Sequence, residues 1–218
     1  MQINIIVPTY NDKEIHNFID CFNKSVIECS DQLIKLHLVI ANDHHKSVTG
    51  AFRKFNPNVT EVQTSIDQWW TKSILVGLDC SKKINSDLTI IATSDVSFNG
   101  AAIKDLTNFM KLNKDITVCH PRVLCTKTKN EVISAKKLLI SKKLYFPKSI
   151  FALNEKSEVD MLSGRFAVIR SEIFNKITFD EHLIHYAADY DFFIRASRHG
   201  HKLVITNEAT VNVDSTRT

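Results

Sequence analysis

The N-terminal part of the chain alternates between short apolar runs and longer amphipathic segments, and this alternation restricts the fold more than any other feature. The apolar runs cover Ile3–Val7, Leu36–Ala41 and Leu88–Ala92. Runs of this length and composition are typical of strands covered on both faces of a parallel sheet. Apolar residues at helical spacing occupy Lys13–Cys29 and Thr71–Lys83 between them. The order of strands and helices therefore predicts an α/β fold with a mostly parallel sheet flanked by helices.

The rest of the chain continues this pattern without a Pro/Gly/Ser-rich linker or an internal repeat, so residues 1–218 are interpreted as one domain. A further helix is predicted to begin at Ser171, with the serine as its N-cap. The other predicted elements are a short helix at Thr49–Phe55, strands at Val59–Gln63, Ile116–Pro121, Leu203–Ile205 and Ala209–Val211, helices at Ala101–Leu112 and Tyr190–Arg198, and one strand over Val159–Arg170 with Gly164 in its middle.

Composition narrows the classes of protein to consider. Hydrophobic residues make up 44% and charged residues 24% of the chain, which is ordinary for a globular protein. The net charge of +4 suits an anionic ligand or a membrane surface but does not indicate a nucleic-acid partner. Five cysteines without a CxxC pair indicate reduced thiols. No run approaches the ~20 apolar residues of a membrane span, so we expect a cytoplasmic protein that at most rests peripherally on the inner membrane face.

A single acid follows the apolar run that ends at Ala92. The sequence there is Thr93-Ser94-Asp95, and a turn signal follows at Asn99-Gly100. Ligands of open α/β sheets bind at the carboxyl ends of strands, and hard cations prefer carboxylate oxygens. Asp95 is therefore placed either to hold such a cation or to cap the next turn or helix; strand and acid alone do not favour one over the other.

The segment from Arg122 to Lys156 has a looser pattern, in which lysines alternate with apolar residues. It reads either as a membrane-facing or acceptor-binding excursion or as a solvated basic face on an ordinary element. We favour the solvated face. The lysines are Lys136, Lys137, Lys142, Lys143 and Lys148.

Polar residues end the first two apolar runs, in Val7-Pro8-Thr9-Tyr10-Asn11 and Val39-Ile40-Ala41-Asn42-Asp43. These motifs resemble the first-strand signature and the second strand of family 2 glycosyltransferases, which have the GT-A fold, with Asn42 in place of the first acid. The resemblance extends from Ile3 to about Ser215. The resemblance implies that Asp43 accepts a hydrogen bond from a uracil or thymine imide. It also implies that the base and ribose are lined by Pro8, Thr9, Tyr10 and Asn11.

Two further segments resemble the parts of the family that hold the diphosphate. Trp69-Trp70 is similar to the segment that precedes the metal strand, which puts Trp70 on the donor side. Ser94-Asp95 resembles the metal motif with one acid instead of two, and implies that Asp95 holds Mg²⁺ or Mn²⁺ with Ser94 beside the donor. Asp214 stands near the place where the family often has a metal-binding histidine, and is a second candidate ligand.

The segment Ala188-Asp189-Tyr190-Asp191 resembles the catalytic Glu-Asp-x-Asp motif, with alanine in place of the glutamate. The resemblance implies that Asp189, or as second choice Asp191, deprotonates the acceptor. Arg195 would then pair with the diphosphate or hold the acidic loop. The alternative is that the two acids cap the helix and pair with Arg195 one turn on.

Asp160 to Phe174 resembles the acceptor-side strand, so Gly164 and Arg165 are predicted to face the acceptor. Together these motifs imply an inverting enzyme that uses a UDP- or dTDP-sugar and a glycan or lipid-linked acceptor, in surface polysaccharide synthesis. One alternative is an inactive glycosyltransferase-like binding module, because Ala188, Ser94 and the missing histidine depart from the family. Another is a sugar nucleotidyltransferase, but Pro8–Glu14 lacks the glycine-rich loop expected of that class.

Overall fold

The computed structural model describes residues 1–10, 12–43, 47–48, 58–65, 69–141, 144–152, 155–184 and 187–214, without the side chains of residues 12, 13, 140, 141 and 144–146. The helices are α1 (Asp12–Cys29), α2 (Trp69–Lys82), α3 (Gly100–Leu112) and α4 (Ala188–Arg198), with 3₁₀ turns η1 (Ser30–Gln32) and η2 (Ser171–Asn175). The strands are β1 (Gln2–Thr9), β2 (Lys35–Asn42), β3 (Val59–Gln63), β4 (Leu88–Ile91), β5 (Val96–Ser97), β6 (Ile116–Cys125), β7 (Ala135–Ser141), β8 (Leu144–Ile150), β9 (Lys156–Val159), β10 (Met161–Leu162), β11 (Ala167–Arg170) and β12 (Lys202–Val213).

The main sheet has nine strands among the described residues. Its first half, β3-β2-β1-β4, is parallel throughout. β11 then runs antiparallel between β4 and β6, and β12 pairs in parallel with β6 and antiparallel with β5 and β9. The predicted fold class is confirmed, with a mixed second half of the sheet.

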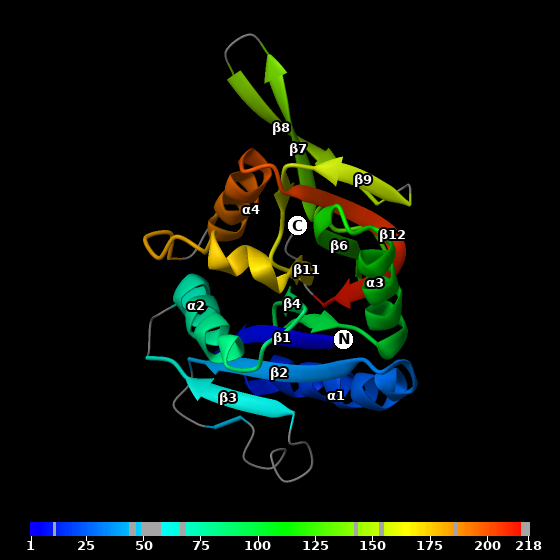
Figure 1. Cartoon of the computed structure of the whole chain (residues 1–218), viewed down its shortest axis with the longest axis vertical. Coiled ribbons are helices and arrows are strands. Elements are labelled where there is room, and N and C mark those ends of the chain that lie inside the picture. Colours follow the sequence, from blue (N-terminus) through cyan, green and yellow to red (C-terminus); the bar gives the residue numbers. More distant parts are fainter. Residues whose placement is uncertain are drawn as a thin grey trace.

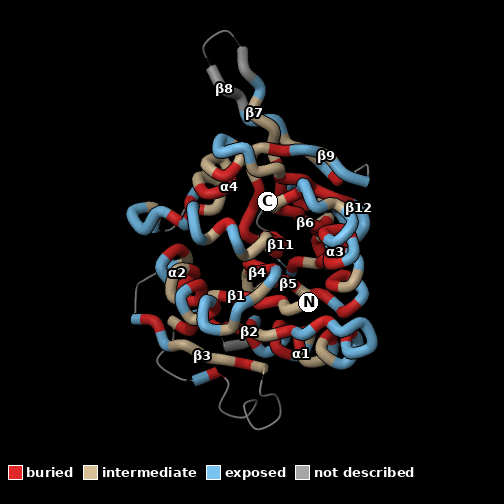
Figure 2. The backbone as a smooth tube through the Cα atoms, in the orientation of Figure 1, coloured by how far each residue is buried: buried red, intermediate tan, exposed pale blue. Residues whose placement is uncertain are grey.

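Helices cover both faces of this sheet, which explains why its strands are apolar without interruption. Side chains of a strand point alternately to opposite faces. In β1, Ile5 and Val7 pack in the core with the buried faces of α1 and α3, whereas Ile6 packs in the core with α2 and α4. Figure 1 shows α1 and α3 on one side of the sheet and α2 and α4 on the other. The buried residues in Figure 2 accordingly concentrate on the strands and on the helix faces turned toward them.

The amphipathic pattern of α1 is confirmed, because Ile15, Phe18, Ile19 and Phe22 are all fully buried. Burial of such a side chain contributes roughly 1.5–3 kcal/mol to folding. Phe18 and Ile19 follow Ile15 by three and four positions, and Phe22 follows them by four and three, so the four residues form one stripe that faces the sheet. Their packing fixes the start of α1 directly after the carboxyl end of β1.

The parallel strands bring their carboxyl ends to one edge of the sheet. The N–H of Asp43 donates to the carbonyl of Thr9 at 2.9 Å, and the N–H of Ala92 donates to the carbonyl of Ile6 at 3.0 Å. β11 runs against β4, with Ala167 opposite Ile91. The residues that lead into β11, including Gly164, therefore lie at the same edge as the residues that leave β4.

Some of the predicted elements are wrong in detail. Val159–Arg170 is not one strand, because the chain turns at Asp160 into β10 and again before β11. The carboxylate of Asp160 accepts a hydrogen bond from the N–H of Leu138 at 2.7 Å and stabilises the first turn. The strands expected at Leu203–Ile205 and Ala209–Val211 form one strand, β12, whose register shifts between Thr206 and Thr210.

The predicted helix at Ser171 is a 3₁₀ turn, and Arg170 rather than Ser171 occupies the N-cap position. The hydroxyl of Ser171 instead shares hydrogen bonds with those of Ser86 and Thr89, at 2.9 and 2.8 Å. The short helix expected at Thr49–Phe55 lies outside the described residues.

The lysine-rich segment contains a hairpin, β7–β8, that projects from the body of the molecule at the top of Figure 1. At its base, β7 pairs with β10 in a separate three-stranded sheet. Leu139 and Lys148 are exposed on it. Whether the hairpin contacts a membrane or an acceptor, or is only a solvated face, stays a prediction. Within the described ranges no helix has the length and apolar character needed to span a bilayer.

Candidate active site

The donor side is predicted at the ends of β1 and β2, where Pro8, Thr9 and Asp43 lie together through the Thr9–Asp43 backbone bond. Asn42, which stands where the family has an acid, is buried and its side-chain amide donates to Glu61 of β3 at 2.7 Å. Asn42 therefore ties β2 to β3, and Asp43 is the acid left at the strand end. Tyr10 is 78% exposed at this edge, and the predicted ligand Asn11 lies outside the described residues.

The turn after β4 brings Ser94, Asp95 and Asp214 to the same edge. Thr93 Oγ1 donates to Asp95 Oδ1 at 2.5 Å, and Ser94 Oγ donates to Oε2 of Glu14 in the first turn of α1 at 3.3 Å. The N–H of Asp214 lies 3.4 Å from the carbonyl of Asp95, because β12 ends beside β5. Ser94, Asp95 and Asp214 are thus neighbours along the chain or across the sheet.

Asp95 does not cap the following helix. The N-cap of α3 is Asn99, whose side-chain oxygen accepts from the N–H of Ala102 at 2.9 Å. The capping interpretation of Asp95 is therefore wrong for α3. In the part of the chain that the structure describes, no three His, Cys, Asp or Glu side chains form a metal-binding group.

Asp95 and Asp214 carry the type of ligand atom that a metal shared with the donor needs, and their role as ligands stays a prediction. Mg²⁺ and similar hard cations are commonly held by one or two carboxylates, with substrate phosphates and waters completing the shell. Both candidate ligands supply such oxygens, and Asp214 is exposed. A closed site made only of protein ligands is not required for this chemistry.

Asp189 is held at the sheet edge by two backbone N–H groups. Its Oδ2 accepts from Gly164 at 3.0 Å, and its Oδ1 accepts from Tyr190 at 2.8 Å. Burial raises the pKa of the Asp189 carboxyl, whereas these hydrogen bonds and the nearby Arg165 guanidinium lower it. Because Gly164 precedes β11, the bond places Asp189 at the edge where Asp95 also lies. The structure thus brings these two predicted residues to one side of the molecule.

Trp70 packs directly against Gly164. A Cβ atom at position 164 would lie 2.5 Å from Cζ2 of Trp70, so only glycine fits this contact. The indole ring also meets Phe179 edge to face, with centroids 5.5 Å apart, and Phe179 stacks on Phe192 of α4 at 4.4 Å. Trp70 therefore fixes the distance between α2, α4 and the Gly164 segment, whatever its role toward the donor.

Asp191 and Arg195 form the ion pair that the alternative interpretation anticipated. Arg195 donates to Asp191 Oδ2 at 2.7 Å and to the carbonyl of Thr178 at 2.8 Å. Both side chains are about one-third exposed. These contacts tie α4 to the preceding loop, so we keep Asp189 as the first choice for the base. The donor role of Arg195 stays a prediction.

Two features near Asp189 were missed by the sequence interpretation. Lys136 Nζ lies 5.0 Å from the centroid of the Tyr190 ring. His120 is fully buried, with Nδ1 donating to the carbonyl of Pro121 at 2.8 Å and Nε2 accepting from Ser163 Oγ at 3.3 Å. The Lys136 contact depends on pairing between β7 and β10, for which the sequence carries no local signal. The burial of His120 follows from its place inside the apolar run of β6.

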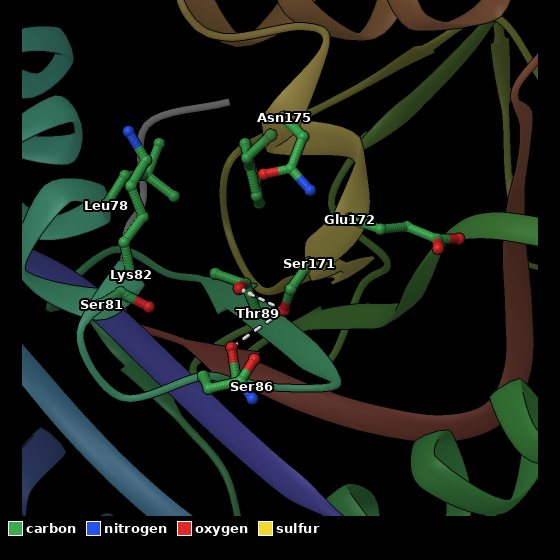
Figure 3. A pocket seen from close by; sticks show the side chains of 10 residues that line it. Leu78, Ser81, Lys82, Ser86, Thr89, Ser171, Glu172 and Asn175 are labelled. Atoms are coloured by element: carbon green, nitrogen blue, oxygen red, sulfur yellow. Dashed lines mark hydrogen bonds between the residues drawn. The ribbon is translucent and has the colours of Figure 1, made fainter.

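A pocket of about 240 Å³ lies elsewhere, at the opposite edge of the sheet. Ser86 and Thr89, at the amino end of β4, share hydrogen bonds with Ser171, which follows the last residue of β11 (Figure 3). Lys82 and Asn175 complete this rim. The pocket is separate from the predicted site, because Asp95 and Gly164 lie at the carboxyl end of β4.

Fold and site together define a GT-A domain, the class of nucleotide-sugar transferases built on such a sheet. The family model described as "Glycosyltransferase like family 2" matches residues 2–218, and the chain belongs to this family. No curated protein matches the sequence.

Solved structures of glycosyltransferases share the fold at low sequence identity. GalNAc-T7, crystallised with UDP, GalNAc and Mn²⁺, superposes with a TM-score of 0.75 at 12% identity, covering 97% of this chain and 43% of its own. S. aureus TarS superposes with a TM-score of 0.74 at 18% identity, and the match covers 99% of this chain and 37% of TarS. TarS 1–349 in complex with UDP-GlcNAc superposes with a TM-score of 0.71 at 16% identity, and the match covers 100% of this chain and 60% of that one. The chain thus spans less than two thirds of each of these proteins, and the similarity concerns the fold.

Proposed function

We propose that this chain is an inverting glycosyltransferase that moves a sugar from a UDP- or dTDP-sugar to a hydroxyl group of a glycan or lipid-linked acceptor. The observation that carries the proposal is the hydrogen bond between Gly164 and Asp189, because it holds a carboxylate at the sheet edge that also carries Asp95. A surface polysaccharide pathway and contact with the inner membrane face belong to the same proposal.

The donor nucleotide is proposed to lie over the ends of β1 and β2. The half-buried carboxylate of Asp43 would accept a hydrogen bond from the imide N–H of uracil or thymine. Thr9 is joined to Asp43 through the backbone, so the base and ribose would meet one rigid surface. The UDP complexes of TarS 1–349 and GalNAc-T7 support this class of donor.

A divalent cation, Mg²⁺ or Mn²⁺, would neutralise charge on the departing diphosphate when it is bound. Asp95 is proposed as its main protein ligand and Asp214 as the second. Thr93 donates to Oδ1 of Asp95, so Oδ2 of the same carboxylate would bind the cation. The Mn²⁺ in the GalNAc-T7 crystal supports the choice of metal.

Asp189 is proposed to remove the proton from the acceptor hydroxyl as that oxygen attacks the anomeric carbon. A carboxylate within ~3 Å of the hydroxyl is suited to this role. The two N–H groups that bind Asp189 fix its orientation before substrate arrives. Attack opposite the leaving diphosphate inverts the anomeric configuration.

A binding module without turnover is the second candidate. It is favoured by the small number of acids near Asp95, since the described residues hold no group of three metal ligands. Ala188, which replaces the family's glutamate, is buried at the start of α4. The sugar nucleotidyltransferase alternative gains no support from the family match.

The experiment measures thermal stability and calorimetric binding with UDP, dTDP and GDP, each with and without MnCl₂, and then UDP release from UDP-GlcNAc. We expect UDP or dTDP to bind in a Mn²⁺-dependent way and GDP to bind more weakly. Asp43→Ala should remove the pyrimidine preference, whereas Asp79→Ala, on the exposed face of α2, should retain it. Absence of binding by every nucleotide would contradict the proposal. Binding without release of UDP from any donor would identify the binding module.

A further inference from the structure

One cationic side chain lies near the proposed base, and a second contacts the ring of the tyrosine that follows it. Arg165 directly follows Gly164, which binds Asp189, and lies close enough to lower the pKa of both Asp189 and Tyr190. Lys136 Nζ lies 5.0 Å from the centre of the Tyr190 ring, and Tyr190 directly follows Asp189. The two cations, the base and the phenol ring therefore form one cluster.

In the described part of the chain, the positive charges of Lys136 and Arg165 are not paired with carboxylates, whereas the charge of the neighbouring Lys137 is. Lys137 lies 3.7 Å from Glu158 and 3.6 Å from Asp160. Among the residues that the structure describes, neither Lys136 nor Arg165 has a carboxylate within ion-pair distance. An aromatic ring attracts an ammonium group but leaves its charge in place. Both side chains are half-buried, where an uncompensated charge is unfavourable.

The cluster belongs to the part of the chain that is predicted to face the acceptor, which contains Gly164 and Arg165. Lys136 belongs to β7, which pairs with β10 opposite Met161, and the chain from β10 leads directly to Gly164. Among the proposed donor ligands, Thr9 instead ends β1, and Asp43 and Asp95 come after β2 and β4 of the main sheet. Arg165 acts on the carboxylate of Asp189, and Lys136 contacts the ring of Tyr190, the next residue. An anionic group near Asp189 would be repelled by the ionised base unless these cations offset the repulsion.

We propose that Lys136 and Arg165 form an oxyanion subsite for the acceptor, so that the natural acceptor carries a phosphate or carboxylate group near the hydroxyl that reacts. This inference rests on the proposed function, because it takes Asp189 as the base. Arg165 is suited to bind such a group with two parallel hydrogen bonds, and Lys136 adds a point charge. The lysine at the root of the hairpin thus contributes to recognition of the acceptor.

The test uses the full chain saturated with UDP and Mg²⁺, whose binding is measured first by calorimetry. Failure of UDP to bind would count against the proposed function, independently of the subsite. The probes are sn-glycerol 3-phosphate, glycerate and neutral glycerol, titrated while amide NMR signals of Gly164 and Arg165 are followed. We expect glycerol 3-phosphate, glycerate or both to shift these signals, with an affinity that falls as NaCl is added, and glycerol to leave them unchanged. Response to one anion or to both distinguishes phosphate from carboxylate acceptors.

Lys136→Met and Arg165→Gln remove the charges while keeping much of each side chain. Each substitution should weaken anion binding about tenfold, and the double variant more, because each removes a charge-assisted contact. Lys148→Met is the matched control, since Lys148 is exposed on the same hairpin and should bind the anion like the unmodified chain.

Three results would overturn the subsite. The first is equal anion affinity in the double variant and the unmodified chain. The second is an equal response of the Gly164 and Arg165 signals to glycerol. The third is competition between glycerol 3-phosphate and UDP, which would assign the two cations to the donor diphosphate.

Discussion

The backbone N–H of Gly164 donates a 3.0 Å hydrogen bond to Oδ2 of Asp189, across 25 positions of sequence. Gly164 lies in the loop before β11, and Asp189 lies in the first turn of α4. The bond therefore joins the main sheet to the helix that carries the proposed base. Trp70 fills the space in front of Gly164, so the position of the base depends on three separate elements.

Replacement of Asp189 by asparagine should abolish most sugar transfer while keeping nucleotide binding. Asparagine has nearly the same shape but does not accept a proton at neutral pH. Loss of a general base typically lowers a rate by about 10²–10⁴-fold. Transfer from UDP-GlcNAc and calorimetric binding of UDP would be measured on the same preparation. A variant that transfers at the normal rate would place the base elsewhere, and Asp191→Asn would then be tested.

The rate of sugar transfer should rise with pH on the acidic side of the pH profile, and the midpoint of this rise should follow the pKa of the Asp189 carboxyl. Burial raises the pKa of Asp189, and the base acts only when ionised, so activity appears as the pH increases through that pKa. Arg165 lowers the same pKa. Arg165→Gln should consequently move the acidic limb of kcat toward higher pH. A limb that stays in place in this variant would show that Asp189 does not set it.

Asp95→Ala should remove the effect of Mn²⁺ on nucleotide binding. Its carboxylate is the main proposed protein ligand. Loss of a residue that only orients a metal ligand typically weakens metal binding about 10–100-fold, so loss of the ligand itself should weaken it by at least about tenfold. Calorimetric titration of UDP with and without MnCl₂ measures the difference. Asp79→Ala removes a carboxylate paired with Lys82 on the surface of α2, and should retain the full metal effect. Unchanged binding in Asp95→Ala would exclude Asp95 from the site.

Gly164→Ala should destabilise the protein because its Cβ would lie 2.5 Å from Trp70. Overpacking of this kind costs about 1–3 kcal/mol. Trp70→Phe removes the ring atoms that clash, so the cost of Gly164→Ala should be smaller in that background by about 1 kcal/mol. Gly200→Ala provides a control at an open position with φ of +83°, and should cost about 1 kcal/mol whichever residue is at position 70. Urea unfolding of the variants measures these differences, and equal costs in both backgrounds would contradict the Trp70 contact.

The sequence predicted the strands and helices with strong periodicity and the edge where their polar ends meet. Val59–Gln63 matches β3 residue for residue, and the strand before Asp95 ends within one residue of its prediction. These elements were predictable because apolar spacing reports burial on a regular backbone. The site was predictable only as a set of chain positions, since the Gly164–Asp189 bond joins segments that are distant in sequence.

The irregular backbone around the site was not predictable from the sequence. Trp69, Phe166 and Ala187 have positive φ angles of 53°, 127° and 66°, and none of them is glycine. Each stands one or two residues from a residue of the site: Trp70, Arg165 and Asp189, respectively. Side chains with a Cβ rarely adopt such angles unless the surrounding packing imposes them. Phe166 is fully buried and its ring lies 4.9 Å from that of Phe98, which is packing of this kind.

His120 should make the protein less stable in mild acid. The neutral ring is fully bonded, with Nδ1 donating to Pro121 and Nε2 accepting from Ser163. Burial lowers the pKa of His120 to about 4, whereas an unfolded histidine titrates near 6.5. The unfolded state therefore binds more protons than the folded state between these two values, and stability falls as the pH decreases through this interval. At pH 5 the loss relative to pH 7.5 is about 2 kcal/mol.

His120→Gln should lack this part of the pH dependence, although it lowers stability at pH 7.5 by disturbing the two hydrogen bonds. The measurement is the free energy of unfolding in urea at pH 7.5 and pH 5 for both proteins. His182→Gln changes a histidine side chain that is 87% exposed and should keep the dependence of the unmodified chain. If His120→Gln loses as much stability as the unmodified chain between the two pH values, another group is responsible.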